Sequence, residues 1–460
     1  MLFNSFVFLL FLPVVFALYW ARRGTHWQNT IVVLASFFFS GWWDWRFLLL
    51  MVATCVANYY IGRRIEHYSD RHRRKAWLLA AIILNIGLLA VFKYFNFFAD
   101  NLAAIFHLLH IKADIPTLRL ILPIGISFYT FQLTAYVVDI YRSQLSSAHS
   151  LRQFLSFVCF FPQLVAGPIE RGKDLLPQFQ RERRFDYSFA VDGMRQFLWG
   201  LMKKMLIADN CAPAVDYAFG HYAELGSLDI FLGLLYFTVQ VYCDFSGYSD
   251  MAIGCAKLFG IRLSTNFNHP FFATTIREFW RRWHMTLMSW LRDYVYFPLG
   301  GSRCSKARHY FNVFVLYMLS GLWHGPNWSF IAWGTWNGFF NVTTKNLRMP
   351  VPISWFITIA VFVLSQIFFR NPTVGDGLRF GARMFSCQGG FHTTVSRFPI
   401  LLAAALFATE WFTRQWAHPF HFGSSGLFSH RPIRWALYAV LFLSCIMLGG
   451  KQVQFIYFQF

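Results

Sequence analysis

A histidine, His324, lies in the middle of an apolar stretch, LSGLWHGPNW, that spans residues 319–328. An ionisable side chain at membrane depth costs free energy and by default faces a cavity, a partner group or a substrate. With an unperturbed pKa of about 6.5, a histidine can accept a proton from a reacting group near neutral pH. These properties make His324 a candidate catalytic base. The alternative is a histidine that only joins helices, with its ring satisfied by a neighbouring carbonyl.

The residues beside His324 predict a broken helix. Gly325 and Pro326 follow the histidine directly, and a non-helical backbone at membrane depth persists only where it borders protein or water. Trp323 and Asn327 flank this break. Both are therefore candidate substrate-binding residues.

A second segment, REFWRRWHMTLMSWLRDYVYFPLGG at residues 277–301, interleaves cations with tryptophans. On one continuous helix, Arg277, Arg281 and His284 would share a stripe. A basic stripe beside tryptophans suits either a phosphate-bearing donor or anchoring to anionic lipid, and the sequence leaves both open. We take Arg281 and Arg282 as candidate donor-binding residues.

Two carboxylates stand in the largely apolar run QVYCDFSGYSDMAIG at residues 240–254. Buried carboxylates need partners, and we expect arginines of the 277–282 segment to supply them. Ion pairing between helices is one role for Asp244 and Asp250. Substrate binding is the other, with Asp250 as the candidate.

Several kinds of chemistry have no signature in this chain. There is no GxSxG elbow, Walker A loop, HExxH pair or Rossmann glycine pattern, which argues against a soluble-type hydrolase, an ATPase and a dehydrogenase. The eight cysteines include no CxxC and do not predict a zinc site or a disulfide framework. We therefore expect no metal site and no bound cofactor.

The elements that position these residues are predicted to be transmembrane helices. The chain of 460 residues is 56% hydrophobic and only 13% charged, whereas soluble domains carry about 25% charged residues. We expect one domain over residues 1–460. Its predicted fold is an all-α polytopic bundle of about 10–12 spanning helices, with further re-entrant or interfacial helices at 262–309. The candidate spans are 3–20, 30–41, 45–61, 76–98, 119–141, 151–169, 193–208, 227–259, 310–340, 352–369, 397–413 and 433–449, with 227–259 and 310–340 each long enough for a helix plus a re-entrant piece.

The formal net charge of +20 invites comparison with nucleic-acid-binding proteins. However, Arg22, Arg23 and the basic residues of 63–75 lie between apolar runs, as cytoplasmic loops do. The excess positive charge is thus explained by topology and by attraction to anionic lipid. We expect the lipid bilayer as a partner and no nucleic acid.

Taken together and in order, the motifs resemble the membrane-bound O-acyltransferase family, and most closely its bacterial polysaccharide branch, which includes alginate O-acetylation. The resemblance covers nearly the whole chain, and the ordered set is more specific than any one motif. The carrying segments are PQLVAGPIER (162–171), DFSGYSDMAIG (244–254), NFNHPF (266–271), FWRRWHMTLMSWLRDYVYFPLGG (279–301), LSGLWHGPNWSF (319–330) and FIYFQF (455–460).

The resemblance implies a bundle of about eleven transmembrane helices around a central tunnel through the membrane, with His324 of the WHG motif as the catalytic residue. It also implies a second histidine, His284, at the other approach to the tunnel. The acyl donor would be acetyl-CoA or another cytoplasmic acyl thioester. Periplasmic or exported acetyltransferases would be partners in modifying an exopolysaccharide such as alginate or cellulose, and the location would be the bacterial inner membrane, crossed many times.

Two other activities stay open at this point. D-alanyl transfer of the teichoic-acid type is a related reaction, although no signature of a small carrier-protein partner is visible. Broken helices and buried charges also occur in transporters and flippases. Against a transporter, the sequence shows no pair of similar halves.

Overall fold

The protein was analysed as a computed structural model that describes residues 1–112, 115–118, 120–347, 349–389, 393, 395–422, 428 and 430–456. Within these ranges every regular element is a helix, and no strand occurs. The all-α prediction is confirmed. The last part of the FIYFQF motif, residues 457–460, lies outside the described residues.

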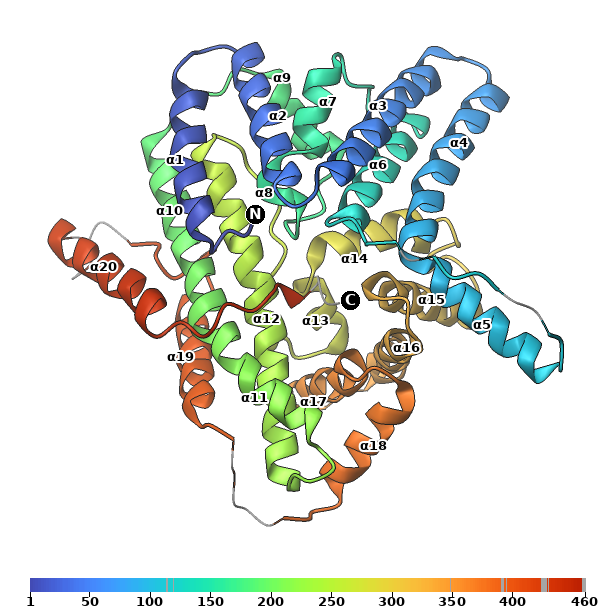
Figure 1. Ribbon diagram of the computed structural model, residues 1–460, viewed down its shortest axis with the longest axis vertical. Helices are drawn as coiled ribbons and strands as arrows, with labels where there is room; N and C mark the ends of the chain where they lie inside the picture. Colours follow the sequence, from blue (N-terminus) through green and yellow to red (C-terminus); the bar gives the residue numbers. More distant parts are fainter. Residues whose placement is uncertain are drawn as a thin grey trace. The chain divides into compact units, whose positions relative to one another are not determined.

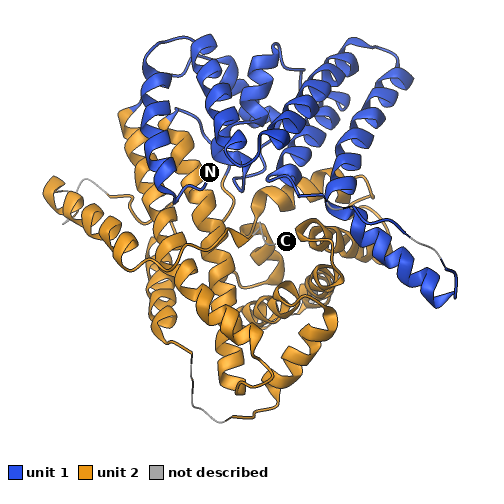
Figure 2. Cartoon of the chain, in the orientation of Figure 1, with its two compact units in different colours: residues 1–186, 259–264 blue, residues 187–258, 265–460 orange. Residues whose placement is uncertain are grey.

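The chain forms two compact units, coloured separately in Figure 2. Unit 1 contains residues 1–186 and 259–264, and unit 2 contains residues 187–258 and 265–460. The expectation of one domain over residues 1–460 remains a prediction.

Unit 1 consists of helices whose starts are often capped by a side chain. Ser5, Asp44, Asp70 and Ser150 each accept a hydrogen bond from a backbone N–H of the following first turn, which satisfies donors that the helix itself leaves open. The elements are α1 (Phe6–Trp20), α2 (Thr25–Gly41), α3 (Trp45–His67), α4 (Arg71–Leu89), the π-helix η1 (Ala90–Tyr94), α5 (Phe95–Leu108), α6 (Ile126–Tyr141), α7 (Leu151–Val158), α8 (Phe161–Leu164) and α9 (Gly172–Gln180) (Figure 1).

Unit 2 carries every candidate site residue. Its elements are α10 (Tyr187–Met202), the π-helix η2 (Lys203–Ala208), α11 (Asp209–Gly220), α12 (Ser227–Leu258), the 3-10 helix η3 (Pro270–Phe272), α13 (Ile276–Arg282), α14 (Met285–Leu291), the π-helix η4 (Arg292–Tyr296), α15 (Lys306–His324), α16 (Trp328–Thr343), the 3-10 helix η5 (Thr344–Asn346), α17 (Val351–Arg370), α18 (Val374–Phe385), α19 (Phe398–Thr413) and α20 (Arg431–Met447).

Helix α12 is the central element of unit 2. It is unbroken over 32 residues, most of them buried, and α10 and α11 pack along it (Figure 1). The expectation of a re-entrant piece within 227–259 is therefore wrong. The glycines of α12 serve close packing instead of a break, since a Cβ at Gly254 would lie 2.4 Å from the carbonyl oxygen of Gly193 on α10.

Four helical stretches are long and apolar enough to cross a membrane by length and composition: 45–67, 71–108, 227–258 and 351–370. Two shorter apolar helices, α1 and α19, add to them. A membrane-spanning helix needs about 20 residues at 1.5 Å each. Several of the predicted spans are divided in the structure, among them 151–169, which contains α7, α8 and non-helical residues from 165 onward.

Candidate active site

The segment around His284 is a break between two short helices. Helix α13 ends at Arg282, and α14 begins at Met285. Backbone hydrogen bonds from residues 266–268 hold the break, one from Asn268 N–H to the Arg282 carbonyl and one from Met285 N–H to the Asn266 carbonyl, both 2.9 Å. The expected continuous stripe of Arg277, Arg281 and His284 is therefore wrong.

His284 itself adopts a left-handed backbone conformation, with φ 43° and ψ 51°. Such a conformation costs a non-glycine residue about 1–2 kcal/mol. It persists only where contacts with the surrounding structure hold the backbone in place. Residues in such conformations cluster at functional sites. Here the NFNHPF segment supplies those surroundings through its backbone bonds.

The ring of His284 is buried, with 1% of the residue exposed, and its Nδ1 atom lies 3.0 Å from Oδ1 of Asn266. Thr286 donates to the same oxygen from its Oγ1 at 2.9 Å and from its backbone N–H at 3.4 Å. The amide nitrogen of Asn266 donates to Oγ of Ser249 at 3.2 Å. Since a backbone N–H can only donate, these contacts identify the Asn266 atom facing His284 as the acceptor oxygen.

This geometry fixes the tautomer of His284. Because the atom that faces Nδ1 is an acceptor oxygen, the ring proton must lie on Nδ1. Nε2 of the neutral ring therefore carries a lone pair. Nε2 is buried and has no hydrogen-bond partner among the residues that the structure describes. Burial lowers the pKa of His284 to about 3, so the ring is neutral at pH 7 and its Nε2 atom can accept a hydrogen bond.

His324 is the last residue of α15 and is 4% exposed. Its ring packs among aromatic rings, with centroid distances of 5.1 Å to Trp333 and 5.2 Å to Phe369. The predicted break follows it, since residues 325–327 lie outside the helices and α16 starts at Trp328.

Close packing of α15 against α16 positions this histidine. A Cβ at Gly321 would lie 2.1 Å from the Phe330 carbonyl oxygen, and one at Gly334 would lie 2.2 Å from the Tyr317 carbonyl oxygen. No larger residue fits at either place without a shift of the backbone. The glycine before the WHG motif therefore sets the distance between the two helices.

Trp323 connects the two histidines. Its ring centroid lies 5.6 Å from that of His284 and 5.0 Å from that of His324. The structure thus brings together three of the residues predicted from the sequence, although they come from the α13–α14 break and from the end of α15.

Asn327, the other predicted neighbour, caps α16. Its Oδ1 accepts from Ser329 N–H at 2.9 Å, and its Nδ2 donates to the Pro372 carbonyl at 2.6 Å. Both ends of the amide are therefore engaged in holding the local backbone.

The two predicted donor-binding arginines lie on the outside of α13. Arg282 forms an ion pair of 2.6 Å with Glu278 one turn earlier, and Arg281 is exposed. A partly exposed ion pair between residues i and i+4 of a helix stabilises the folded protein by only about 0.3–0.5 kcal/mol.

The buried carboxylates of α12 pair with two lysines of the π-helix η2, and the expectation that arginines of 277–282 are their partners is wrong. Asp250 lies 2.5 Å from Lys203 and accepts from Gln196 at 2.9 Å. Asp244 lies 2.6 Å from Lys204. Lysines on the neighbouring buried helix reach these carboxylates, whereas α13 holds its own basic side chains elsewhere.

The lysine pair also ties down residues near the C-terminus. Lys204 donates to the Val453 carbonyl at 3.0 Å, and Ile456 N–H donates to Asp244 at 2.7 Å. Phe455 then packs 6.0 Å from Phe245, whose ring contacts His284 at 4.6 Å. Sequence reasoning missed these lysines, whose signal is an adjacent pair of cations inside the apolar run 193–208.

Among the described residues, no group of three or more His, Cys, Asp or Glu side chains could hold a metal ion.

Comparison of the sequence with known proteins places the chain in a family. The sequence model of the membrane-bound O-acyltransferase family matches residues 141–369, a range that contains both histidines. A Pseudomonas aeruginosa protein named probable alginate O-acetylase AlgI is 40% identical over 401 residues, which cover 85% of this chain and 76% of that protein. The chain belongs to the membrane-bound O-acyltransferase family. It is an enzyme of that class, as the resemblance in the sequence predicted.

Other relatives of this O-acyltransferase act on different polymers. The Helicobacter pylori protein named peptidoglycan O-acetyltransferase is 35% identical over 430 residues, covering 85% of this chain and 80% of that protein. The Bacillus subtilis teichoic acid D-alanyltransferase is 29% identical over 275 residues, covering 55% of this chain and 68% of that protein. The two O-acetyl-transferring relatives thus match more of the chain at higher identity.

Proposed function

We propose that this O-acyltransferase moves an acetyl group from a cytoplasmic acyl thioester, such as acetyl-CoA, toward the O-acetylation of an exopolysaccharide such as alginate or cellulose. The observation that carries the proposal is the pair of buried histidines, His284 and His324, in contact with one tryptophan ring. The chain would lie in the inner membrane of a bacterium and cross it many times. About eleven helices would span the bilayer around a tunnel that admits donor and acceptor.

The reaction that fits the pair is attack of an acceptor hydroxyl on the thioester carbonyl. His324 takes the hydroxyl proton as the new C–O bond forms, the C–S bond then breaks, and the proton leaves with the thiolate as a free thiol. Positioned base catalysis of this kind contributes roughly 10²–10⁴ in rate. The aromatic shell of Trp323, Trp333 and Phe369 excludes water and so limits hydrolysis of the thioester.

His284, whose ring also contacts Trp323, would serve as a second proton acceptor. Its Nε2 atom carries the lone pair, because Asn266 holds the proton on Nδ1. A neutral ring with an acceptor facing outward can bind a hydroxyl or the thiol that leaves. Asn266 is then a positioning residue that acts through His284.

Substrate must reach a ring that is almost fully buried. We infer that the side chains around His324 move apart when donor binds, with the glycine-packed α15–α16 pair as the rigid frame. The acyl group would pass to periplasmic or exported acetyltransferases, which would modify the polymer itself.

The test is acyl transfer by purified protein in proteoliposomes loaded with labelled acetyl-CoA. His324→Ala should abolish transfer while leaving thermal stability and membrane insertion unchanged. The matched control is His107→Ala, which removes an exposed histidine of α5. Full transfer by His324→Ala would refute the proposed base.

The same assay separates the other activities. A transporter would move an intact acyl compound across the bilayer without cleaving the thioester. A D-alanyl transferase would use a D-alanyl thioester in preference to acetyl-CoA.

A further inference from the structure

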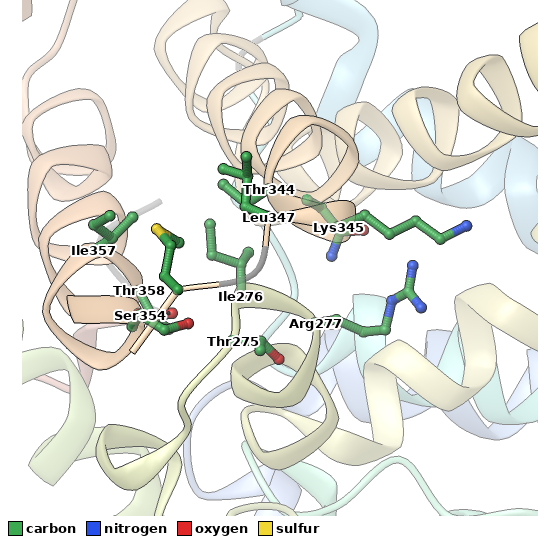
Figure 3. Close-up of a pocket in the computed structure, with 11 residues that line it drawn as sticks. Thr275, Ile276, Arg277, Thr344, Lys345, Leu347, Ser354, Ile357 and Thr358 are labelled. Atoms are coloured by element: carbon green, nitrogen blue, oxygen red, sulfur yellow. Dashed lines mark hydrogen bonds between the residues drawn. The ribbon is translucent and has the colours of Figure 1, made fainter. Parts of the chain in front are cut away.

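A cavity of about 210 Å³ opens in unit 2, and neither His284 nor His324 is among its described lining residues. Its lining comes from the start of α13, the end of α16 with η5, and the first turns of α17, as Figure 3 shows. Drug-sized ligands occupy about 300–1,000 Å³, so this cavity suits one charged group of a larger molecule.

The charge in the cavity is positive. Arg277 and Lys345 line it, and Figure 3 shows their side chains extending the same way from two different elements. Neither forms an ion pair with a described carboxylate, whereas Arg282 on the same helix does. No aspartate or glutamate is among the described lining residues. Two cations held near each other without an anion repel, and a bound anion would relieve that repulsion.

A third basic group lies within electrostatic reach. His309, in the first turn of α15, has a pKa lowered by burial and by the charges of Lys345 and Arg277. Its Nδ1 atom lies 2.9 Å from the hydroxyl of Tyr296. The charges of Arg277 and Lys345 therefore act together on one neighbouring side chain, which favours its neutral form.

The remaining lining offers neutral hydrogen-bonding groups. Asn341 and the hydroxyl residues Thr275, Thr344, Ser354 and Thr358 also line the cavity. The hydroxyls of Thr344, Ser354 and Thr358 donate to backbone carbonyls. Arginine binds phosphate oxygens through a planar fork, and lysine binds them as a point charge. Two cations with no carboxylate among the described lining residues suit an anion that carries two negative charges, such as a phosphate, better than an apolar chain.

We propose that this cavity binds a phosphate group, supplied by the nucleotide end of the acyl-thioester donor. The proposal rests on the proposed function for the source of the phosphate, whereas the phosphate chemistry rests on the cavity alone. The headgroup of an anionic phospholipid offers the same chemistry from the bilayer. The sequence-based prediction named Arg281 and Arg282 as donor-binding residues and stays a prediction, whereas this proposal assigns the phosphate to Arg277 and Lys345.

Binding without turnover is the first test. The full chain in detergent is titrated with adenosine 3′,5′-bisphosphate, which carries the phosphates and no thioester. The double variant Arg277→Gln with Lys345→Gln should bind at least tenfold more weakly. Arg71→Gln with Lys75→Gln removes the same charges from exposed positions of α4 and should bind as the native chain does. Since no reaction is needed, this test can succeed even if the proposed function fails.

The source of the phosphate follows from two further measurements. For a donor source, the Arg277/Lys345 variant raises the KM for acetyl-CoA about tenfold or more but not that for acetyl-pantetheine, which lacks the nucleotide. For a lipid source, native activity depends on phosphatidylglycerol in phosphatidylcholine vesicles, and the variant loses that dependence. Equal bisphosphate affinity in native chain and variant, together with an unchanged KM and an unchanged lipid dependence, would overturn the phosphate site.

Discussion

The side-chain oxygen of Asn266 lies 3.0 Å from Nδ1 of His284 and holds the imidazole proton on that nitrogen. The same oxygen accepts from Thr286, and the amide nitrogen donates to Ser249. One asparagine therefore joins α12, the NFNHPF segment and the start of α14. Its role resembles that of the third member of a catalytic triad, which orients a histidine without touching substrate.

Replacing Asn266 with alanine should lower kcat about 10–100-fold and leave the donor KM nearly unchanged. The reason is that His284 loses the bond that fixes its tautomer, worth about 1–3 kcal/mol for a buried donor. Thr286→Val is the control, because it removes one hydrogen bond to the same oxygen but leaves the His284 contact intact. Equal kcat values for the two variants would show that the loss is only structural.

Asn266→Asp should shift the pH profile in a defined direction. In the native chain the His284 pKa of about 3 keeps the ring neutral throughout the assay range. A carboxylate at 266 favours the imidazolium and raises this pKa. Because a protonated ring cannot accept a proton, activity of the variant should fall as the pH drops below its raised pKa and recover at higher pH.

The measurement is kcat/KM from pH 5 to 9 for both proteins in the same detergent. On the acidic side of the profile, the activity of the variant should begin to fall at a higher pH than the activity of the native chain. A profile identical in shape would mean that His284 is not titrating in the reaction.

The break after His324 could be predicted, whereas the break at His284 could not. Gly325 and Pro326 end a helix by local chemistry, since proline lacks the N–H that continues the ladder. Trp283 and His284 carry no such signal, and their break depends on backbone hydrogen bonds from residues 266–268. Those bonds form only after the chain has folded, so a periodicity argument continues the helix through them.

The buried carboxylates show a similar limit. Their residue types predicted that cations would pair with Asp244 and Asp250, and the structure confirms pairing. Which cations reach these carboxylates depends on how α10 and η2 pack along α12. A local sequence pattern does not determine that packing. The sequence-based prediction named only the arginines of 277–282, whereas the partners are the lysines at 203–204.

Gly321→Ala should destabilise the protein by about 1–3 kcal/mol, the usual cost of overpacking a well-packed interior. The added methyl would meet the Phe330 carbonyl oxygen at 2.1 Å and push α15 from α16. Gly87→Ala on α4 is the matched control, because nothing lies within 4 Å of its added Cβ. In thermal unfolding, Gly321→Ala should have a lower melting temperature than the native chain, whereas Gly87→Ala should not. Equal melting of the two variants would contradict the close helix contact.

Lys203→Met should lower the free energy of unfolding by about 3–5 kcal/mol, because it leaves the carboxylate of Asp250, only 14% exposed, without its cation. The pair of Lys203 and Asp250 is 2.5 Å apart, and the lysine side chain is 3% exposed. Adding Asp250→Asn removes the unpaired charge and should restore much of the lost stability. Arg379→Met breaks an exposed pair with Asp376 and should change stability by less than about 1 kcal/mol.

Enzyme activity in the same variants separates the two roles of Asp250. If Asp250 only holds helices together, the double variant should regain activity together with stability. If Asp250 binds substrate, the double variant should be stable yet show a raised KM. A stable Lys203→Met single variant would instead mean that the ion pair contributes little, and that Gln196 alone satisfies the carboxylate.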